Sequence, residues 1–344
     1  MEENTGCKVC VTGSSGYIGS WIVKRLLEKR YIVHATLRNL GDPNKVGLLK
    51  SLTNAERNLR LFEADIYSPN DYERAIQGCK YVIHLATPVL RDFKDESNQT
   101  EETSEAAVGG IRSIMESCRR SGTVKRLIYT ASVVAASPIQ DDGKAFKPSM
   151  DESCWTPLNI SFPYTIEGLM AYTHSKTLSE KELLRFNRDE DGQLEVVSLN
   201  CGVVGGDTIL SIMPESMAML VSQIIDNKRY AVLRFLEEVN GNVPIVHIED
   251  VCEAHIFCME KSSLNGRFLC ASAYLASAEI ASHWRKYHPD INIAEELVED
   301  LGREIVWGST KLKEIRFEYK FNAKMILDGS LKCAQRMGHF CSTD

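Results

Sequence analysis

The 344-residue sequence predicts an α/β fold built on a doubly wound parallel sheet, with a smaller α/β part toward the C-terminus. Two observations support this fold class. Near the N-terminus, a short apolar strand runs into a glycine-rich turn and then into an amphipathic helix. Up to residue 132, runs of β-forming residues alternate with helical stretches and short turns, which is the pattern of a parallel sheet covered by helices.

The glycine-rich turn contains Gly13, Gly16 and Gly19 in the spacing G-x-x-G-x-x-G. It follows the apolar strand that begins near Val9, and the helix after it carries Trp21 on its apolar face. A strand, a glycine turn and a helix in this order are typical of Rossmann-type sheets, in which the helix N-terminus binds a pyrophosphate. We expect the first glycine to allow the tight turn, the second to admit the phosphates, and the third to let the helix pack closely.

A second strand is predicted at residues 31–37 and ends at Arg38, about twenty residues after the turn, where NAD-binding chains carry a carboxylate for the ribose 2′-hydroxyl. Lys45 follows in what we predict to be a loop with Gly and Pro. A cation at this place suits a 2′-phosphate, so the pattern favours NADP over NAD. The alternative is that Arg38 is a solvated charge at a strand end.

The next elements continue the alternation, and the carboxyl ends of parallel strands face the ligand crevice. We therefore expect Ala86, Thr87 and Ser132 to lie near the glycine turn. The strands are predicted at residues 60–65, 80–86 and 125–132, and the helices at 70–78 and 100–121.

Beyond residue 132 the pattern changes. A loop-rich segment at 140–167 precedes a helix at 171–187 and a strand at 195–199, and the insertion at 205–245 is expected to cover a substrate. A small strand is predicted near 267–270. We predict two parts, a nucleotide-binding domain at 1–204 and a mainly substrate-binding part at 205–344 with segments that return to the sheet.

Composition excludes several classes of partner. A formal net charge of −7 argues against a nucleic-acid backbone, and the absence of a run of 18 apolar residues argues against a membrane span. The acidic start is unlike a signal peptide, so a cytoplasmic protein is expected. Eleven cysteines include one C-x-x-C pair, Cys7 and Cys10, which a strand would point to opposite faces. We expect no metal, a small-molecule substrate, and a monomer or weak homodimer.

A Y-x-x-x-K pair lies on the helix predicted at 171–187. Tyr172 and Lys176 are four residues apart and therefore share a helical face. A neighbouring ammonium lowers the pKa of a phenol, and such a tyrosine can give a proton to a carbonyl oxygen while hydride arrives at the carbon. Ser132, at a strand end, can donate to the same oxygen. Taken alone, the pair fits two residues on the surface of a helix much better than an active site.

The glycine turn, the strand-end Ser132 and the Y-x-x-x-K helix, in this order, resemble the short-chain dehydrogenase/reductase superfamily, and VTGSSGYIG at residues 11–19 resembles its extended branch. Within that branch the chain is similar, over residues 7–335, to the plant dihydroflavonol 4-reductase / anthocyanidin reductase family, which includes vestitone reductase-like and cinnamoyl-CoA reductase-like enzymes. The motifs that carry this similarity are LATP at 85–88, DESCW at 151–155, SKTLSE at 175–180 and VHIEDV at 246–251.

The resemblance implies a role for each matching residue. Ser132, Tyr172 and Lys176 would be catalytic, and His247 and Asp250 structural. The residues implied to bind NADP are Thr12, Gly13, Gly16, Tyr17, Ile18, Gly19, Arg38, Lys45, Asp65, Ile66, Ala86, Thr87, Tyr172, Lys176 and Val203. Those expected to contact substrate are Pro88, Ser132, Ser137 and Asn200.

Three positions depart from the family pattern. Where the family usually shows two serines, this chain has Ala131 followed by Ser132, and the retained Ser132 matches the catalytic one. The stretch that begins at Asn200 lacks the proline that relatives place beside the nicotinamide, and Ser137 stands where dihydroflavonol reductases commonly carry Asn. We therefore expect an NADPH-dependent carbonyl reductase of plant secondary metabolism that acts on a ring ketone of a flavonoid-like or related phenolic compound. Anthocyanidin reductase-type chemistry and reduction of an alkaloid or lignan carbonyl are alternatives. A non-catalytic NADP-binding protein is the hypothesis from another class.

Overall fold

The computed structural model divides the chain into two compact units. It describes residues 6–68, 70–88, 99–165, 167–186, 194–225, 227–291 and 293–339. The first unit comprises Met1–Ala131, Ala171–Leu199 and Cys252–Arg267, and the second comprises Ser132–Met170, Asn200–Val251 and Phe268–Asp344. Residues 132–170, which precede position 204, thus fall in the second unit, and residues 252–267, which follow it, fall in the first.

The first unit is built on a seven-stranded sheet in the order β10-β7-β5-β4-β1-β2-β3. The pairs β1–β2, β1–β4, β2–β3 and β4–β5 are parallel, which confirms the predicted fold class. Its strands are β1 (Lys8–Thr12), β2 (Ile32–Leu37), β3 (Leu59–Glu63), β4 (Tyr81–His84), β5 (Arg126–Ser132), β7 (Glu195–Cys201) and β10 (Gly266–Cys270).

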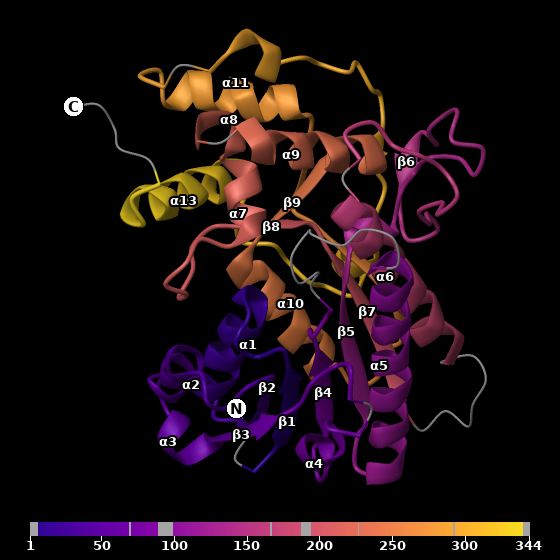
Figure 1. Cartoon of the computed structure of the whole chain (residues 1–344), viewed down its shortest axis with the longest axis vertical. Coiled ribbons are helices and arrows are strands. Elements are labelled where there is room, and N and C mark those ends of the chain that lie inside the picture. Colours follow the sequence, from indigo (N-terminus) through magenta and orange to yellow (C-terminus); the bar gives the residue numbers. More distant parts are fainter. Residues whose placement is uncertain are drawn as a thin grey trace. The chain divides into compact units, whose positions relative to one another are not determined.

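Helices connect these strands, and Figure 1 draws the first of them in indigo to violet. On α5, Ile111, Ile114 and Met115 are buried in one apolar cluster with Leu127 and Tyr129 of β5. A parallel sheet needs such cover, because its crossover helices must hide apolar faces. The helices are α1 (Tyr17–Glu28), α2 (Pro43–Lys50), α3 (Ala55–Asn58), α4 (Glu73–Ile76), α5 (Gln99–Ser121), α6 (Glu167–Phe186) and α10 (Ile248–Glu260).

The strand order contains a topological switch point. From β1 the chain moves outward to β2 and β3, and then returns to place β4 on the other side of β1. In open α/β sheets, ligands bind outside the carboxyl ends of the strands at this point. In the register of β1 and β4, Thr12 lies opposite His84, so the two strands end side by side.

The second unit contains two smaller sheets. In the three-stranded sheet, β9 pairs antiparallel with β11 and parallel with β8. The strands are β6 (Ser149–Met150), β8 (Val203–Gly205), β9 (Val243–His247), β11 (Ala273–Leu275) and β12 (Val306–Trp307). The helices are η1 (Val133–Ala135), α7 (Glu215–Leu220), α8 (Ser222–Ile225), α9 (Asn227–Asn240), α11 (Ser277–Tyr287), η2 (Glu295–Leu297), α12 (Lys311–Glu314) and α13 (Ala323–Arg336).

His247 and Asp250 have structural contacts in this unit. The His247 ring stacks on Phe321 with 3.6 Å between centroids, and the Asp250 carboxylate accepts the backbone N–H groups of Lys320 and Phe321 at 3.0 and 3.2 Å. Together they hold the segment before α13. Among the described residues, no helix is both long enough and apolar enough to span a membrane.

Two predicted elements differ from the observed ones. The loop expected around Lys45 is the helix α2, because Pro43 suits a first helical position and the Asp42 carboxylate caps the backbone N–H groups of Asn44 and Lys45. The helix expected at 70–78 contracts to α4. Its first part forms tight turns instead, with Glu73 N–H bonded to Asn70 O at 3.2 Å.

Candidate active site

Two glycines of the turn are required by the fold itself. Gly13 has φ +65°, a left-handed conformation, and a Cβ there would lie 2.9 Å from the backbone nitrogen of Ala86. A Cβ on Gly19 would lie 2.3 Å from the carbonyl oxygen of Gly13. The turn is therefore packed against the end of β4 on one side and against α1 on the other.

Gly16 is different, because nothing inside the chain requires a glycine there. Its φ is −78°, and a Cβ would meet only Gly13 O at 3.4 Å, an ordinary contact. Gly16 is the N-cap of α1, where no side chain caps the helix and no acidic residue occupies the first turn, which begins with Tyr17 and Ile18. A helix N-terminus of this kind, with open space at its glycine, fits a pyrophosphate.

The hydroxyl of Thr12 fixes the geometry between β1 and β4. Its oxygen accepts the backbone N–H groups of Leu85 at 3.0 Å and Ala86 at 3.1 Å. Its own proton is then directed to Nδ1 of His84, 2.7 Å away, which assigns the imidazole proton to Nε2. Burial, with a smaller effect from Lys176, lowers the pKa of His84 to about 3, so the ring is neutral. The segment after β4 is thus held beside the glycine turn.

Lys176 lies where β4 and β5 end. Its ammonium donates to Oγ1 of Thr87 at 2.8 Å and to the carbonyl oxygen of Thr130 at 2.9 Å. It lies 5.9 Å from the ring centroid of Tyr172 and 4.9 Å from that of Tyr129, and the residue is only 4% exposed. The two members of the Y-x-x-x-K pair therefore lie together at the carboxyl edge of the sheet, and not on the outer surface of α6.

A buried ion pair anchors α6. Glu180, one turn beyond Lys176, is fully buried and accepts Nε and Nη2 of Arg267 at 2.9 and 3.0 Å and Oγ of Ser198 at 2.6 Å. Breaking such a pair typically costs about 3–5 kcal/mol, because the remaining charge stays buried. The helix that presents Tyr172 and Lys176 is therefore fixed to β7 and β10.

Ser132 is the last residue of β5, two residues after Thr130, and belongs to the second unit. Its carbonyl oxygen accepts Nδ2 of Asn200 at 3.2 Å, and the next carbonyl, of Val133, accepts Nδ2 of Asn240 at 2.8 Å. Both asparagines are fully buried. Asn200 thus holds the backbone of Ser132, and Asn240 is a second supporting residue that sequence reasoning missed, since its partner is 107 residues away.

The cations proposed for a 2′-phosphate differ in their surroundings. Arg38 is exposed immediately after β2. Lys45 lies on the first turn of α2, and its ammonium is 3.3 Å from the carboxylate of Asp42. Nearby, Glu63 accepts the N–H of Leu40 at 3.0 Å. Lys45 therefore already has an opposite charge beside it, whereas Arg38 stands at the strand end itself.

The residues assigned to adenine follow β3. Asp65 accepts the N–H of Tyr67 at 3.2 Å, and its own N–H donates to Asp71 at 3.1 Å, so the turn after the strand is well defined. Ile66 is buried, and α5 approaches it at Gly110, where a Cβ would lie 2.5 Å from Ile66 Cγ1.

Of the residues assigned to substrate, Pro88, Ser137 and Asn200 are buried, and Ser132 is half-buried. Ser137 is fully buried, with its hydroxyl donating to Val239 O and accepting Ile139 N–H at 3.1 Å. A contact with substrate would require these partners to be exchanged. Pro88 is buried and precedes residues 89–98, which lie outside the described residues, and Val203 is 5% exposed in β8.

His174, between the catalytic candidates in sequence, has another location. It lines a groove of about 880 Å³ between α5 and α6, together with charged residues that include Glu101, Arg112 and Lys181. The groove is on a face of α6 different from the one that carries Lys176, so His174 is not part of the candidate active site.

Comparison with known proteins agrees with this geometry. The model of the NAD dependent epimerase/dehydratase family matches residues 9–271. The chain is 33% identical over 341 residues to dihydroflavonol 4-reductase of Gerbera hybrida, covering 98% of this chain and 88% of that protein. It is 35% identical over 332 residues to dihydroflavonol 4-reductase of Solanum lycopersicum, with coverages of 95% and 82%. The crystal structure of vestitone reductase from alfalfa (Medicago sativa) superposes with a TM-score of 0.78 at 29% identity, covering 97% and 99%.

The chain therefore belongs to the NAD-dependent epimerase/dehydratase family, the extended branch of the short-chain dehydrogenases/reductases. Within that family it resembles the plant dihydroflavonol 4-reductase group. It is an NAD(P)-dependent oxidoreductase that acts on carbonyl groups.

Proposed function

We propose that the protein is an NADPH-dependent reductase that converts a ring ketone of a flavonoid-like or related phenolic compound of plant secondary metabolism to an alcohol. The names of its relatives support this substrate class, since they include dihydroflavonol 4-reductases and vestitone reductase. We further propose that it works in the cytoplasm. None of the ten cysteines among the described residues forms a disulfide bond, which suits a reducing compartment.

One observation carries the catalytic proposal. Lys176 is buried at the carboxyl edge of the sheet, bonded to Thr87 and Thr130, with the Tyr172 ring beside it. A buried ammonium with two fixed acceptors is held in place before any ligand arrives, so no ordering cost falls on the reaction itself.

In the proposed mechanism, Tyr172 donates its phenolic proton to the carbonyl oxygen of the substrate, and the Lys176 ammonium stabilises the resulting phenolate. Ser132 donates a hydrogen bond to the same oxygen and polarises the carbonyl group. Bound NADPH supplies the hydride that reduces the carbonyl carbon. Asn200 and Asn240, which hold the backbone at and after Ser132, keep its hydroxyl in position.

The cofactor would lie across the switch point. Gly13, Gly16 and Gly19 would surround its pyrophosphate, with donors from the first turn of α1, and Arg38 would bind the 2′-phosphate, assisted by Lys45. The adenine would contact Asp65 and Ile66, the ribose Ala86 and Thr87, and the nicotinamide Val203. Pro88, Ser137 and Asn200 are the candidates on the substrate side.

A broader substrate range is also consistent with the relatives. A bifunctional dihydroflavonol 4-reductase/flavanone 4-reductase of Malus domestica is 31% identical over 333 residues, so one relative has two reductase activities. Reduction of anthocyanidins, or of alkaloid or lignan carbonyls, would use the same three catalytic groups. A substrate panel separates these reactions.

The test measures NADPH consumption by the purified protein with flavanonols, anthocyanidins, isoflavanones and alkaloid ketones. Tyr172→Phe should lower kcat by about 10²–10⁴-fold, because general acid catalysis contributes about that much, while NADPH still binds. The matched control is Tyr287→Phe, an exposed tyrosine on α11, which should leave kcat unchanged. If the Tyr172→Phe variant binds NADPH and keeps full activity, the acid is another group. If the wild type binds NADPH but reduces none of the panel, a non-catalytic role is favoured.

A further inference from the structure

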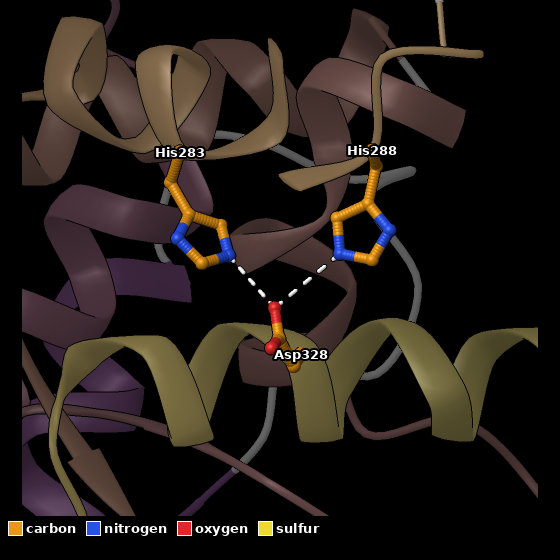
Figure 2. A group of neighbouring side chains, drawn as sticks. All are labelled: His283, His288 and Asp328. Atoms are coloured by element: carbon orange, nitrogen blue, oxygen red, sulfur yellow. Dashed lines mark hydrogen bonds and ion pairs between the residues drawn. The ribbon is translucent and has the colours of Figure 1, made fainter. Parts of the chain in front are cut away.

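The second unit contains a cluster of two histidines and a carboxylate that the reductase site does not use. His283 lies on α11, His288 follows the end of that helix, and Asp328 lies on α13. Figure 2 shows both imidazole rings pointing down from the α11 segment toward the same carboxylate oxygen. The three residues come from segments 40 and 45 positions apart in sequence, so their convergence is a product of the fold.

The separations of Oδ1 of Asp328 from the two imidazole nitrogens approach those in a tetrahedral metal site. Oδ1 of Asp328 is 2.8 Å from Nε2 of His283 and 3.3 Å from Nε2 of His288, and all three atoms lie within 4.8 Å of one another. With zinc bonds of about 2.0–2.1 Å, tetrahedral geometry separates neighbouring ligand atoms by roughly 3.3–3.4 Å. The distance from Oδ1 to Nε2 of His288 already matches this separation, and a small rotation of the side chains would lengthen the shorter distance to His283.

The surroundings also suit a metal. The other carboxylate oxygen of Asp328 is bonded by Lys324, one turn earlier on α13, which orients Oδ1 toward the histidines. The Trp284 and Tyr287 rings flank His283, each with its centroid 4.9 Å from that of the imidazole. Such partners, which orient the ligands and limit access of water, are characteristic of metal sites in proteins.

We propose that His283, His288 and Asp328 form a site for one zinc ion, which would bridge α11 and α13. Two neutral imidazoles and one carboxylate are ligands that zinc accepts, and three protein ligands leave a fourth position for water. When zinc binds, the Nε2 lone pair of each imidazole coordinates the metal, and the imidazole proton moves to Nδ1. The side chains of His283, His288 and Asp328 are 10%, 29% and 19% exposed, so an ion can reach the cluster from solvent.

The alternative is a purely hydrogen-bonded cluster that ties the two helices without a metal. The two interpretations predict different effects for Lys324→Ala. If zinc binds, removing this partner, which orients the Asp328 carboxylate, should weaken zinc affinity by about 10–100-fold. If hydrogen bonds alone matter, the variant should melt at a lower temperature, with zinc making no difference.

The experiment titrates the full-length protein, freed of metal by a chelator that is then removed, with Co²⁺ as a spectroscopic probe and Zn²⁺ as competitor. We expect one equivalent of Co²⁺ with the intense visible bands of four-coordinate nitrogen and oxygen ligation, and without the near-ultraviolet band of a thiolate ligand. Zinc should abolish these bands. It should also raise the melting temperature by several degrees when present at about 100 times its Kd.

Variants assign the site. Two variants remove a ligand: His288→Ala, which changes the most exposed one, and Asp328→Asn. Loss of an outer-shell partner typically lowers metal affinity by roughly 10–100-fold, and each of these variants should lower the affinity for Co²⁺ by more than that. The matched control, His339→Ala, changes an exposed histidine near the end of α13 and should bind Co²⁺ like the wild type. Far-ultraviolet circular dichroism verifies that each variant is folded. The proposal is overturned if the wild type takes up no stoichiometric Co²⁺, if His288→Ala keeps the bands, or if His339→Ala loses them.

Discussion

At the scale of single residues, the hydroxyl of Thr12 organises the place where β1 and β4 end. It accepts two backbone N–H groups from the segment after β4 and gives its own proton to His84. All of its hydrogen-bonding capacity is therefore directed, and the position of Ala86 and Thr87 depends on a residue more than 70 positions earlier. Thr87 in turn accepts a hydrogen bond from the Lys176 ammonium. The residues proposed to bind the cofactor are therefore connected by hydrogen bonds to the proposed catalytic lysine.

Also at this scale, Arg38 is expected to decide the cofactor. Arg38→Asp should weaken NADPH binding by roughly 10–150-fold and leave NADH binding nearly unchanged, because a hydrogen bond to a charged group is worth about 1.5–3 kcal/mol. Titration of the tryptophan fluorescence with each nucleotide gives both Kd values. Lys50→Asp, which places the same change on an exposed residue of α2, serves as the control. Equal affinity of the wild type for NADPH and NADH would contradict the assignment of Arg38.

At the scale of elements, the glycine turn combines two kinds of requirement. Gly13 and Gly19 are crowded by the protein's own backbone, whereas Gly16 has open space at the start of α1. Gly13 and Gly19 are therefore needed for folding, whereas Gly16 is expected to be needed for ligand binding. The buried Glu180–Arg267 pair has a comparable role for α6, because it fixes a helix whose proposed catalytic residues, Lys176 and Tyr172, lie one turn and two turns before Glu180.

This distinction gives a paired prediction. Gly19→Ala should lower the free energy of unfolding by about 1–3 kcal/mol, the usual range for overpacking, because its methyl group would clash with Gly13 O. Gly16→Ala should change stability by less than about 0.5 kcal/mol and weaken NADPH binding at least tenfold. Urea unfolding and nucleotide titration measure the two effects. A Gly16→Ala protein with wild-type affinity would show that no phosphate approaches this glycine.

At the scale of the whole molecule, buried histidines contribute to the response to acid, and burial lowers the pKa of His34 and His283 as well as that of the two residues that follow. Burial lowers the pKa of His84 to about 3 and, against a smaller opposing effect of Asp207, that of His247 to about 4. Both are lower than the ordinary value near 6.5, so the unfolded chain binds more protons than the folded one between pH 6.5 and 4. Stability therefore rises with pH in this window and is lost as the pH falls through it.

The expected slope is about 1.4 kcal/mol per pH unit for each histidine once the pH is well below 6.5. In the same region, burial raises the pKa of Glu237 and of Asp250, which gain protons on folding and oppose the loss. Urea unfolding at a series of pH values measures how the free energy of unfolding changes with pH. His247→Gln should reduce this slope by about the contribution of one histidine. His339→Gln, at an exposed position, should leave the slope as it is, and an unchanged slope in His247→Gln would contradict the argument.

The same scale shows what sequence reasoning could reach. The glycine turn, the parallel strands and the Tyr172–Lys176 spacing are local patterns, and the fold class and family that they indicated are confirmed. Contacts between distant segments leave no local signal. For that reason sequence reasoning missed three contacts: the hydrogen bond from Asn240 to Val133, the hydrogen bond from Thr12 to His84, and the contacts of His283 and His288 with Asp328. It also missed the helices α9 and α10, because polar and apolar residues are mixed along them and hide the helical period. The roles assigned to single site residues stay predictions.

The exposure of Arg38 has a consequence for metabolism. On the proposed assignment, the choice between NADPH and NADH rests mainly on one solvated side chain at the end of β2, since Lys45 is already paired with Asp42. NADPH and NADH are separate pools of reducing power, and a cell keeps them in different states of reduction. A change of one codon could therefore connect this reductase to the other pool, and reverse the direction in which its reaction runs, without disturbing the core of either unit.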